Sequence, residues 1–344
     1  MRTTVVTLHV LIAAVLSGCG DDGAENATLS ETLSARGIDL TTLFAPPSAE
    51  ELDALTMAWA HEQPGPEGLR DEASYVLPSG DSMRVISHLV GENRHYGVVV
   101  VPAGAHEAES LPVAIDLAGF GVEMVLEVPS EIRALNGEFV TLLPSFRGQE
   151  LRFEEQSWFS EGDPYDQCEG GSEDALAFIE AALESTPVAS RAELVAIGGS
   201  RGGNVAMLLG VRGSKVRGVV EIAGPTDYLR EELLDHPNVS ALYANYFVRD
   251  LLDGGTDVDE ARRRMLACSP LYFAERLPPT QAHHGTEDQN VPFAQAELLD
   301  ARMRELGRVP PEFELFAYPG GDHQLSDELD LIGERVRVFL DALD

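Results

Sequence analysis

The chain has 344 residues, of which 44% are hydrophobic, and this content is typical of a folded globular protein rather than a disordered one. Its 58 Asp and Glu residues outnumber its 24 Lys and Arg residues, so the formal net charge is −34 at pH 7. A surface this acidic repels phosphate backbones and anionic lipids, which argues against nucleic acid as a partner.

Residues 1–18 are predicted to be an export signal rather than part of the fold. Arg2 precedes the apolar run VVTLHVLIAAVLSG, which is too short for a membrane-spanning helix. The run ends in LSGC, so the segment resembles a bacterial lipoprotein signal that is cleaved before Cys19, whose thiol is then acylated. An ordinary secretory signal that is cut nearby is the alternative. With the lipoprotein signal, the protein is exported and touches a membrane only through its N-terminal lipid.

The segment over residues 19–45 is predicted to be a flexible tether, because the polar stretch GDDGAENATLS follows the cysteine. Gly20 stands where an aspartate can favour retention in the inner membrane. The outer membrane is therefore slightly favoured, with the protein facing the periplasm or the cell surface. Residues 46–344 are expected to form a single domain.

Two further cysteines, Cys168 and Cys268, would meet an oxidising compartment in an exported protein. A disulfide between them and two separate buried thiols are equally compatible with the sequence. Neither cysteine has His or Asp neighbours at the spacing of a cysteine nucleophile, so no thiol chemistry is predicted.

The predicted elements fall into two groups along the chain. Residues 46–62 are typical of a helix, and residues 75–104 alternate like an antiparallel ribbon of strands. From about residue 110, short apolar strands alternate with helices, which indicates a mostly parallel sheet covered on both faces. Residues 228–267 break this alternation and are predicted to be a helical cap insertion. The strands are expected within 111–121, 138–148, 192–200, 216–224, 279–288 and 313–321, and the helices within 172–183, 201–211, 294–306 and 326–343.

The stretch LVAIGGSRGGNVAML, residues 194–208, places Ser200 in a G-x-S-x-G pattern between an apolar strand and a helix. In this pattern the serine occupies a sharp turn with strained backbone angles, and small neighbours let the turn approach the sheet. Its hydroxyl is then exposed at the carboxyl end of the strand. Ser200 is therefore the predicted nucleophile, and an ordinary glycine-rich turn is the alternative.

Two later loops supply the partners that a serine nucleophile needs. Asp288 follows a strand in HHGTEDQNVP and is predicted to orient a histidine, with Glu287 and Asp227 as rivals for that role. His323 lies in YPGGDHQL between the last strand and the last helix, and it is the predicted general base. The order Ser, Asp, His, each in a strand-to-helix loop, is the order of the α/β-hydrolases.

An oxyanion hole is expected from two backbone N–H groups near the serine. Arg201 follows Ser200 at the start of the helix, and Phe120 lies in the loop LAGFG after an early strand. Glycines in that loop allow the backbone to approach a carbonyl oxygen closely. Phe120 and Arg201 are therefore the predicted donor pair, with a plain turn at LAGFG as the alternative.

Together these motifs resemble the catalytic domain of the prolyl oligopeptidase family, within the α/β-hydrolases, from about residue 95 to residue 344. The segments that carry the resemblance are GGSRGG, SPLYFAERLPPTQAHHGTEDQNVP, FAYPGGDHQL and LLPSFRG. The resemblance implies a serine hydrolase with Ser200 as nucleophile, Asp288 as acid and His323 as base. It implies an α/β-hydrolase fold in which a doubly wound, mostly parallel sheet follows the N-terminal ribbon.

Cleavage of short peptides through an acyl-enzyme is the function predicted first. A carboxylesterase or acyl-carbohydrate esterase with the same three residues is the alternative, because two features depart from the family. The N-terminal part is too short for the β-propeller of the large family members, and LAGFG lacks their usual His-Gly or Tyr. A lesser alternative is a surface binding protein that kept the fold and lost activity. No cofactor is expected, since the mechanism needs no metal and the sequence contains no Cys/His cluster or Gly-rich phosphate loop.

Overall fold

The computed structural model of the chain describes residues 27–61, 67–121, 123–126, 137–166, 168–213 and 215–343. The predicted export signal and its acylated Cys19 lie outside these residues, so both stay predictions. No helix within the described ranges is long and apolar enough to cross a membrane.

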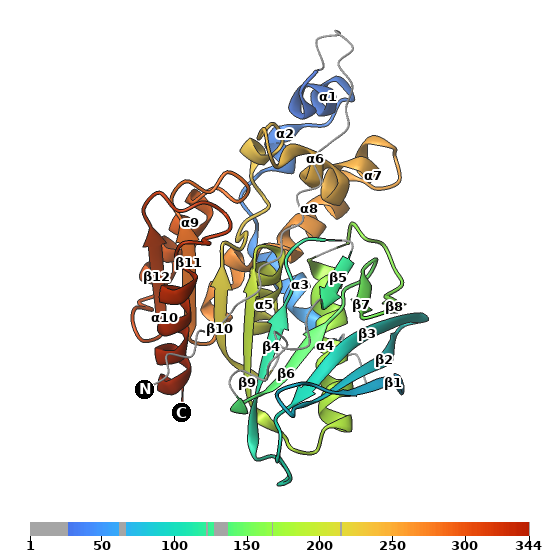
Figure 1. Ribbon diagram of the computed structural model, residues 1–344. Helices are drawn as coiled ribbons and strands as arrows, with labels where there is room; N and C mark the ends of the chain where they lie inside the picture. Colours follow the sequence, from blue (N-terminus) through green and yellow to red (C-terminus); the bar gives the residue numbers. More distant parts are fainter. Residues whose placement is uncertain are drawn as a thin grey trace.

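A mixed sheet forms the centre of the molecule (Figure 1), and within the described residues nine strands build it, in the order β1-β2-β3-β6-β4-β9-β10-β11-β12. The pairs β1–β2, β2–β3 and β3–β6 are antiparallel, and the remaining pairs are parallel. The predicted N-terminal ribbon and mostly parallel sheet are thereby confirmed. The bounds are Glu67–Val76 for β1, Ser82–Val90 for β2, Asn93–Val101 for β3, Leu111–Leu117 for β4, Val140–Pro144 for β6, Ala189–Gly199 for β9, Val216–Ile222 for β10, Thr280–Gly285 for β11 and Phe313–Tyr318 for β12.

Helices cover both faces of this sheet, because successive side chains along a strand point to opposite sides. On β9, Leu194 and Ala196 belong to the same hydrophobic core as α4 and α5. Val195 and Ile197 belong to a second core, which they share with α10. The doubly wound arrangement follows directly from this alternation. The helix bounds are Ala49–His61 for α3, Glu169–Ser185 for α4, Arg201–Val211 for α5, Ala294–Glu305 for α9 and Leu329–Ala342 for α10.

A second, smaller sheet packs beside the antiparallel end of the main sheet. It consists of β5 (Glu123–Leu126), β7 (Glu150–Phe153) and β8 (Gln156–Phe159), in the order β5-β7-β8 among the described residues. Leu151 and Phe153 are buried in a core with side chains of β2 and β3. The sequence did not predict this sheet, because a four-residue strand is too short to show a period of two.

The inserted segment 228–267 is helical, as predicted. It contains short helical turns and one longer helix, α8, whose first turn is capped by the Asp257 carboxylate through the N–H of Glu260 at 2.9 Å. The insertion begins with a 3-10 turn at Glu231–Leu233. The bounds of its other helical elements are Ser240–Tyr243 for α6, Ala244–Val248 for a π-helical turn, Arg249–Leu252 for α7 and Val258–Ala267 for α8.

The prediction of a flexible tether over residues 19–45 is wrong from residue 27 onward. The chain forms α1 (Leu29–Ala35) and α2 (Leu40–Leu43), and Leu33 and Leu43 are fully buried in the main core. These apolar side chains lie beyond the polar stretch 20–30 on which the tether prediction rested, and α1 and α2 fold against the inserted segment (Figure 1).

One arginine of the insertion holds this N-terminal segment in place. Arg262 of α8 is 5% exposed, and its Nη1 donates hydrogen bonds to the carbonyl oxygens of Thr42, Leu43 and Ala45 at 2.7–3.0 Å. Its Nε donates to the Glu51 carboxylate at 2.9 Å. A single buried cation therefore satisfies three backbone carbonyls at the end of α2 and balances one carboxylate of α3.

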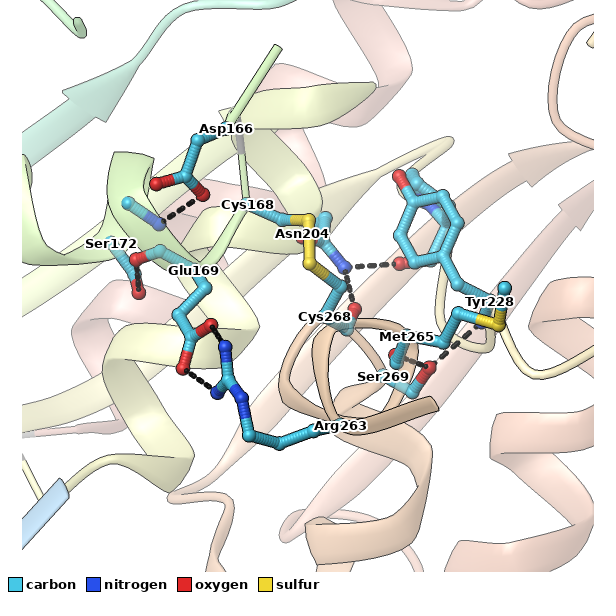
Figure 2. Close-up of a disulfide and its surroundings, with 12 residues drawn as sticks. Asp166, Cys168, Glu169, Ser172, Asn204, Tyr228, Arg263, Met265, Cys268 and Ser269 are labelled. Carbon is cyan, nitrogen blue, oxygen red and sulfur yellow. Dashed lines mark hydrogen bonds and ion pairs between the residues drawn. A yellow bond between two sulfur atoms is a disulfide. The ribbon is translucent and has the colours of Figure 1, made fainter. Parts of the chain in front are cut away.

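Figure 2 shows that Cys168 and Cys268 form a disulfide, which was one of the two alternatives for these residues. Cys168 precedes α4 and Cys268 follows α8, so the bond joins the end of the insertion to a helix of the main core. Asn204 of α5 donates hydrogen bonds to the carbonyls of Cys268 and Pro225, at 2.9 and 2.8 Å. The end of the insertion is thus fixed to two helices.

We expect Arg262→Met to loosen residues 27–45 from the domain. The substitution keeps an unbranched apolar side chain but removes the hydrogen-bond donor of three carbonyls. A hydrogen bond from a charged donor contributes about 1.5–3 kcal/mol to the free energy of unfolding. Limited proteolysis should then cut near residues 36–48 faster than in the wild type. Arg302→Met, at a half-exposed arginine of α9, is the matched control and should leave the cleavage rate unchanged. Equal cleavage of wild type and Arg262→Met would show that this arginine does not hold the segment.

Candidate active site

Ser200 lies at the junction of β9 and α5 in a strained backbone conformation, with φ 55° and ψ −123°. A side chain on Gly198 would overlap the backbone of Gly202, and one on Gly202 would overlap the carbonyl of Leu117. The Ser200 N–H donates to the carbonyl of Ile222 on β10 at 2.7 Å, which fixes the turn to the next strand. The glycines of the motif are therefore required by close backbone approach, and the turn has the geometry predicted for a nucleophile elbow.

The structure brings the predicted triad together. His323 Nε2 lies 3.0 Å from Ser200 Oγ, and His323 Nδ1 lies 2.6 Å from Asp288 Oδ2. His323 and Asp288 are 7% and 5% exposed, while Ser200 is half-buried. A half-buried serine whose hydroxyl faces a buried imidazole can be reached by a substrate and can pass its proton to that imidazole.

The Asp288 carboxylate is held by several donors. Its Oδ1 accepts from the backbone N–H groups of Asn290 and Val291, at 2.8 and 2.9 Å. Burial alone would raise the pKa of Asp288, but hydrogen bonds from His284 and His323 outweigh it and hold that pKa well below the usual range. Asp288 is therefore ionised at neutral pH and can stabilise a positive charge on His323.

Neither rival acid reaches the histidine. Glu287 is exposed, and its backbone N–H donates to Gly321 at the base of the histidine loop. The Asp227 carboxylate is buried, but it accepts from the N–H of Leu229 at 2.9 Å and from the hydroxyl of Tyr272 at 3.1 Å. Asp227 thus stabilises the loop after β10, and Asp288 is the carboxylate that contacts the imidazole.

Arg201 has a second role that the sequence did not reveal. Its side chain is 5% exposed, and Nη2 donates to the carbonyls of Gly119 and Ala118 at 2.6 and 3.4 Å. The guanidinium lies 4.5 Å from the centre of the Phe146 ring. Burial lowers the pKa of Arg201 to about 10, so the group remains charged at neutral pH. The residue after the nucleophile therefore holds the loop that leads directly to Phe120, the other predicted oxyanion donor.

His284 is a second residue that sequence reasoning left without a role. It lies on β11, is fully buried, and its Nε2 is 3.3 Å from Asp288 Oδ2. The only signal in the sequence was its place in HHG immediately before the acid loop.

We expect Arg201→Met to lower kcat for hydrolysis of p-nitrophenyl acetate by about 10–100-fold, somewhat less than loss of an oxyanion donor itself. The substitution leaves the Arg201 backbone N–H in place but releases the loop at Gly119. Arg201→Lys, whose ammonium can still donate to that carbonyl, should recover part of the rate. Circular dichroism must show an intact fold. A kcat for Arg201→Met within twofold of the wild type would mean that the side chain does not position the loop.

Comparison with known proteins agrees with this geometry. The sequence model described as the prolyl oligopeptidase family matches residues 128–341. No curated protein matches the chain significantly.

The acylaminoacyl peptidase of Pyrococcus horikoshii superposes with a TM-score of 0.58 at 17% identity, covering 76% of this chain and 41% of that one. A puromycin-hydrolysing peptidase of Mycobacterium tuberculosis superposes with a TM-score of 0.57 at 17% identity, and the match covers 79% of this chain and 45% of the peptidase. Acetyl xylan esterase 1 of a Thermoanaerobacterium species superposes with a TM-score of 0.64 at 16% identity, and the match covers 89% of this chain and 98% of the esterase. The chain thus spans less than half of either peptidase and nearly all of the esterase. At these identities the superpositions establish the fold, and the family match over 128–341 establishes that the chain belongs to the prolyl oligopeptidase family and is a serine hydrolase with an α/β-hydrolase fold.

Proposed function

We propose that Ser200 attacks an acyl carbonyl carbon while His323 takes the serine proton at Nε2. The tetrahedral intermediate then collapses, His323 gives that proton to the leaving group, and an acyl-enzyme remains on Ser200 Oγ. Water, deprotonated in turn by His323, hydrolyses the acyl-enzyme and restores the serine. The observation that carries this proposal is the continuous chain of hydrogen bonds from Ser200 through His323 to Asp288, at 3.0 and 2.6 Å.

The negative charge of the intermediate falls on the former carbonyl oxygen. We assign its stabilisation to the backbone N–H groups of Arg201, at the start of α5, and of Phe120, in the loop that the Arg201 side chain holds. Since Phe120 has no hydroxyl to donate, backbone groups alone would perform this task.

The substrate class proposed first is the short peptide, in line with the family and with the two peptidases that share the fold. An acyl ester is the second candidate, and one observation favours it. The shared fold extends over 98% of the acetyl xylan esterase but over only 41% and 45% of the peptidases.

A fluorophosphonate probe should label the wild type at Ser200, and Ser200→Ala should not be labelled. The same substitution should lower hydrolysis on the order of a million-fold, because the nucleophile acts as a unit with its base. Aminoacyl and dipeptidyl p-nitroanilides, p-nitrophenyl acetate and acetylated xylan form the substrate panel. Turnover of the esters without any amide cleavage would replace the peptidase assignment by the esterase one.

Two variants of neighbouring acidic residues test the role of Asp288 in the same assay. Asp288→Asn should lower the rate by about ten-thousand-fold, as expected for loss of the group that orients the base. Glu287→Gln removes an adjacent but exposed carboxylate and serves as the matched control with wild-type rate. An unlabelled wild type would reject Ser200 as the nucleophile.

We further propose that Cys19 carries the lipid that attaches the enzyme to a bacterial membrane, most favourably the outer one. When the full-length protein is produced in a bacterium, labelled palmitate should enter the wild type but not Cys19→Ser. The wild type should also sediment with membranes, whereas the variant should not. Equal sedimentation of both, without palmitate in either, would contradict acylation at this cysteine.

A further inference from the structure

Two buried titratable side chains beside the triad have no part in the proposed mechanism. Glu221 on β10 and His284 on β11 are both fully buried. The parallel register pairs Glu221 of β10 with Ala282 of β11, and His284 lies two residues after Ala282 on β11. The two side chains therefore project from the same face of neighbouring strands, at the carboxyl end where Ser200 and Asp288 lie.

The hydrogen bonds of His284 define which of its nitrogens carries a proton. Nε2 lies 2.9 Å from the carbonyl oxygen of Val291, which can only accept, so Nε2 is protonated. The same nitrogen lies 3.3 Å from Asp288 Oδ2, the oxygen that also accepts from His323 Nδ1 at 2.6 Å. One carboxylate oxygen of the triad is thus shared by two imidazoles, of which only His323 reaches Ser200.

The remaining polar atoms of the pair are Nδ1 of His284 and Oε1 of Glu221. Neither has a hydrogen-bond partner within the described ranges, while Glu221 Oε2 accepts from the N–H of Gly224 at 2.9 Å. The charged groups facing His284 are Glu221 from β10 and Asp288 from the loop after β11, with the Phe293 ring 5.8 Å from its own. No hydrogen bond joins the two side chains, so they interact through space, and the charge on one changes the free energy of charging the other.

Burial and neighbouring groups shift the pKa of both residues. Burial raises the pKa of Glu221 to about 7, although His284 and the Gly224 N–H oppose the rise. Burial alone would lower the pKa of His284, but Asp288, Glu221 and the Val291 carbonyl outweigh it and raise that pKa. Each group therefore makes the other easier to charge.

We propose that Glu221 and His284 are positioning residues for Asp288 that together carry one titratable proton in the active enzyme, and that a second proton taken up at lower pH weakens the activation of Ser200. The proposal rests on Ser200 being the nucleophile. With one titratable proton on the two residues, the pair is neutral overall, and Asp288 directs its full negative charge towards His323. With two protons His284 is cationic, competes for the shared Oδ2, and leaves Asp288 less able to stabilise a positive charge on His323.

The rate of fluorophosphonate labelling, measured from pH 5 to pH 9, tests this without a known substrate. The wild-type profile should need two ionisations on its acid side. His284→Gln keeps an N–H donor near the position of Nε2 but cannot titrate, so its profile should need one ionisation, with a plateau within about threefold of the wild type. Glu221→Gln removes one of the groups that raise the pKa of His284, so the second ionisation should move to lower pH. His284→Leu, which removes the donor to Asp288, should lower the plateau about tenfold.

His283→Gln is the matched control, because His283 is the adjacent buried histidine on β11 but faces the other side of the sheet, bonded to Tyr318 and Gln281. It should keep the two-ionisation profile. The inference would be overturned by a wild-type profile with one ionisation, by two ionisations in His284→Gln, or by a second ionisation in Glu221→Gln at the same pH as in the wild type. Should Glu221→Gln fail to fold by circular dichroism, His284→Gln alone decides. Absence of labelling in the wild type would instead reject the proposed function.

Discussion

The site depends on one strained turn, in which Ser200 adopts φ 55° between β9 and α5. A backbone in this region costs on the order of 1–3 kcal/mol for a residue with a side chain, so the surroundings must impose it. They do so through the bond from the Ser200 N–H to Ile222 and through the close approach of Gly202 to Leu117 on β4. The strands on both sides of β9 therefore hold the serine, and its hydroxyl direction follows from the sheet itself.

The insertion is tied to this turn by a different set of bonds. α5 starts at the elbow, and its Asn204 bonds the carbonyls of Pro225 and Cys268 at the two ends of the inserted segment. The disulfide to Cys168 adds a covalent link between the same end and α4 (Figure 2). The insertion is thus joined at both ends to the helix that begins at Ser200, so a displacement of either end would be transmitted to the turn that holds this serine.

Much of this arrangement could be predicted from the sequence because it depends on local patterns. Apolar strands alternating with helices gave the sheet, and glycine spacing gave the elbow at Ser200. Asp288 and His323 could be chosen because each follows a strand, and parallel strands end at the same edge. What could not be predicted depends on pairing between distant segments. The hold of Arg262 on residues 42–45 and the approach of Glu221 to His284 require a register that no single stretch encodes.

The docked N-terminal segment has a geometric consequence for an enzyme attached through Cys19. The backbone N–H of Ser30 in α1 donates a hydrogen bond to Asp235 of the insertion. The N-terminal segment therefore meets the domain at the top of the view in Figure 1, and the C-terminal end of α10 lies at the bottom. The eight residues 19–26 can span at most about 28 Å even when fully extended. With a lipid on Cys19, the insertion would therefore be held close to the bilayer surface. The orientation of the molecule would be restricted, and the enzyme would hydrolyse acyl compounds within a thin layer next to the membrane.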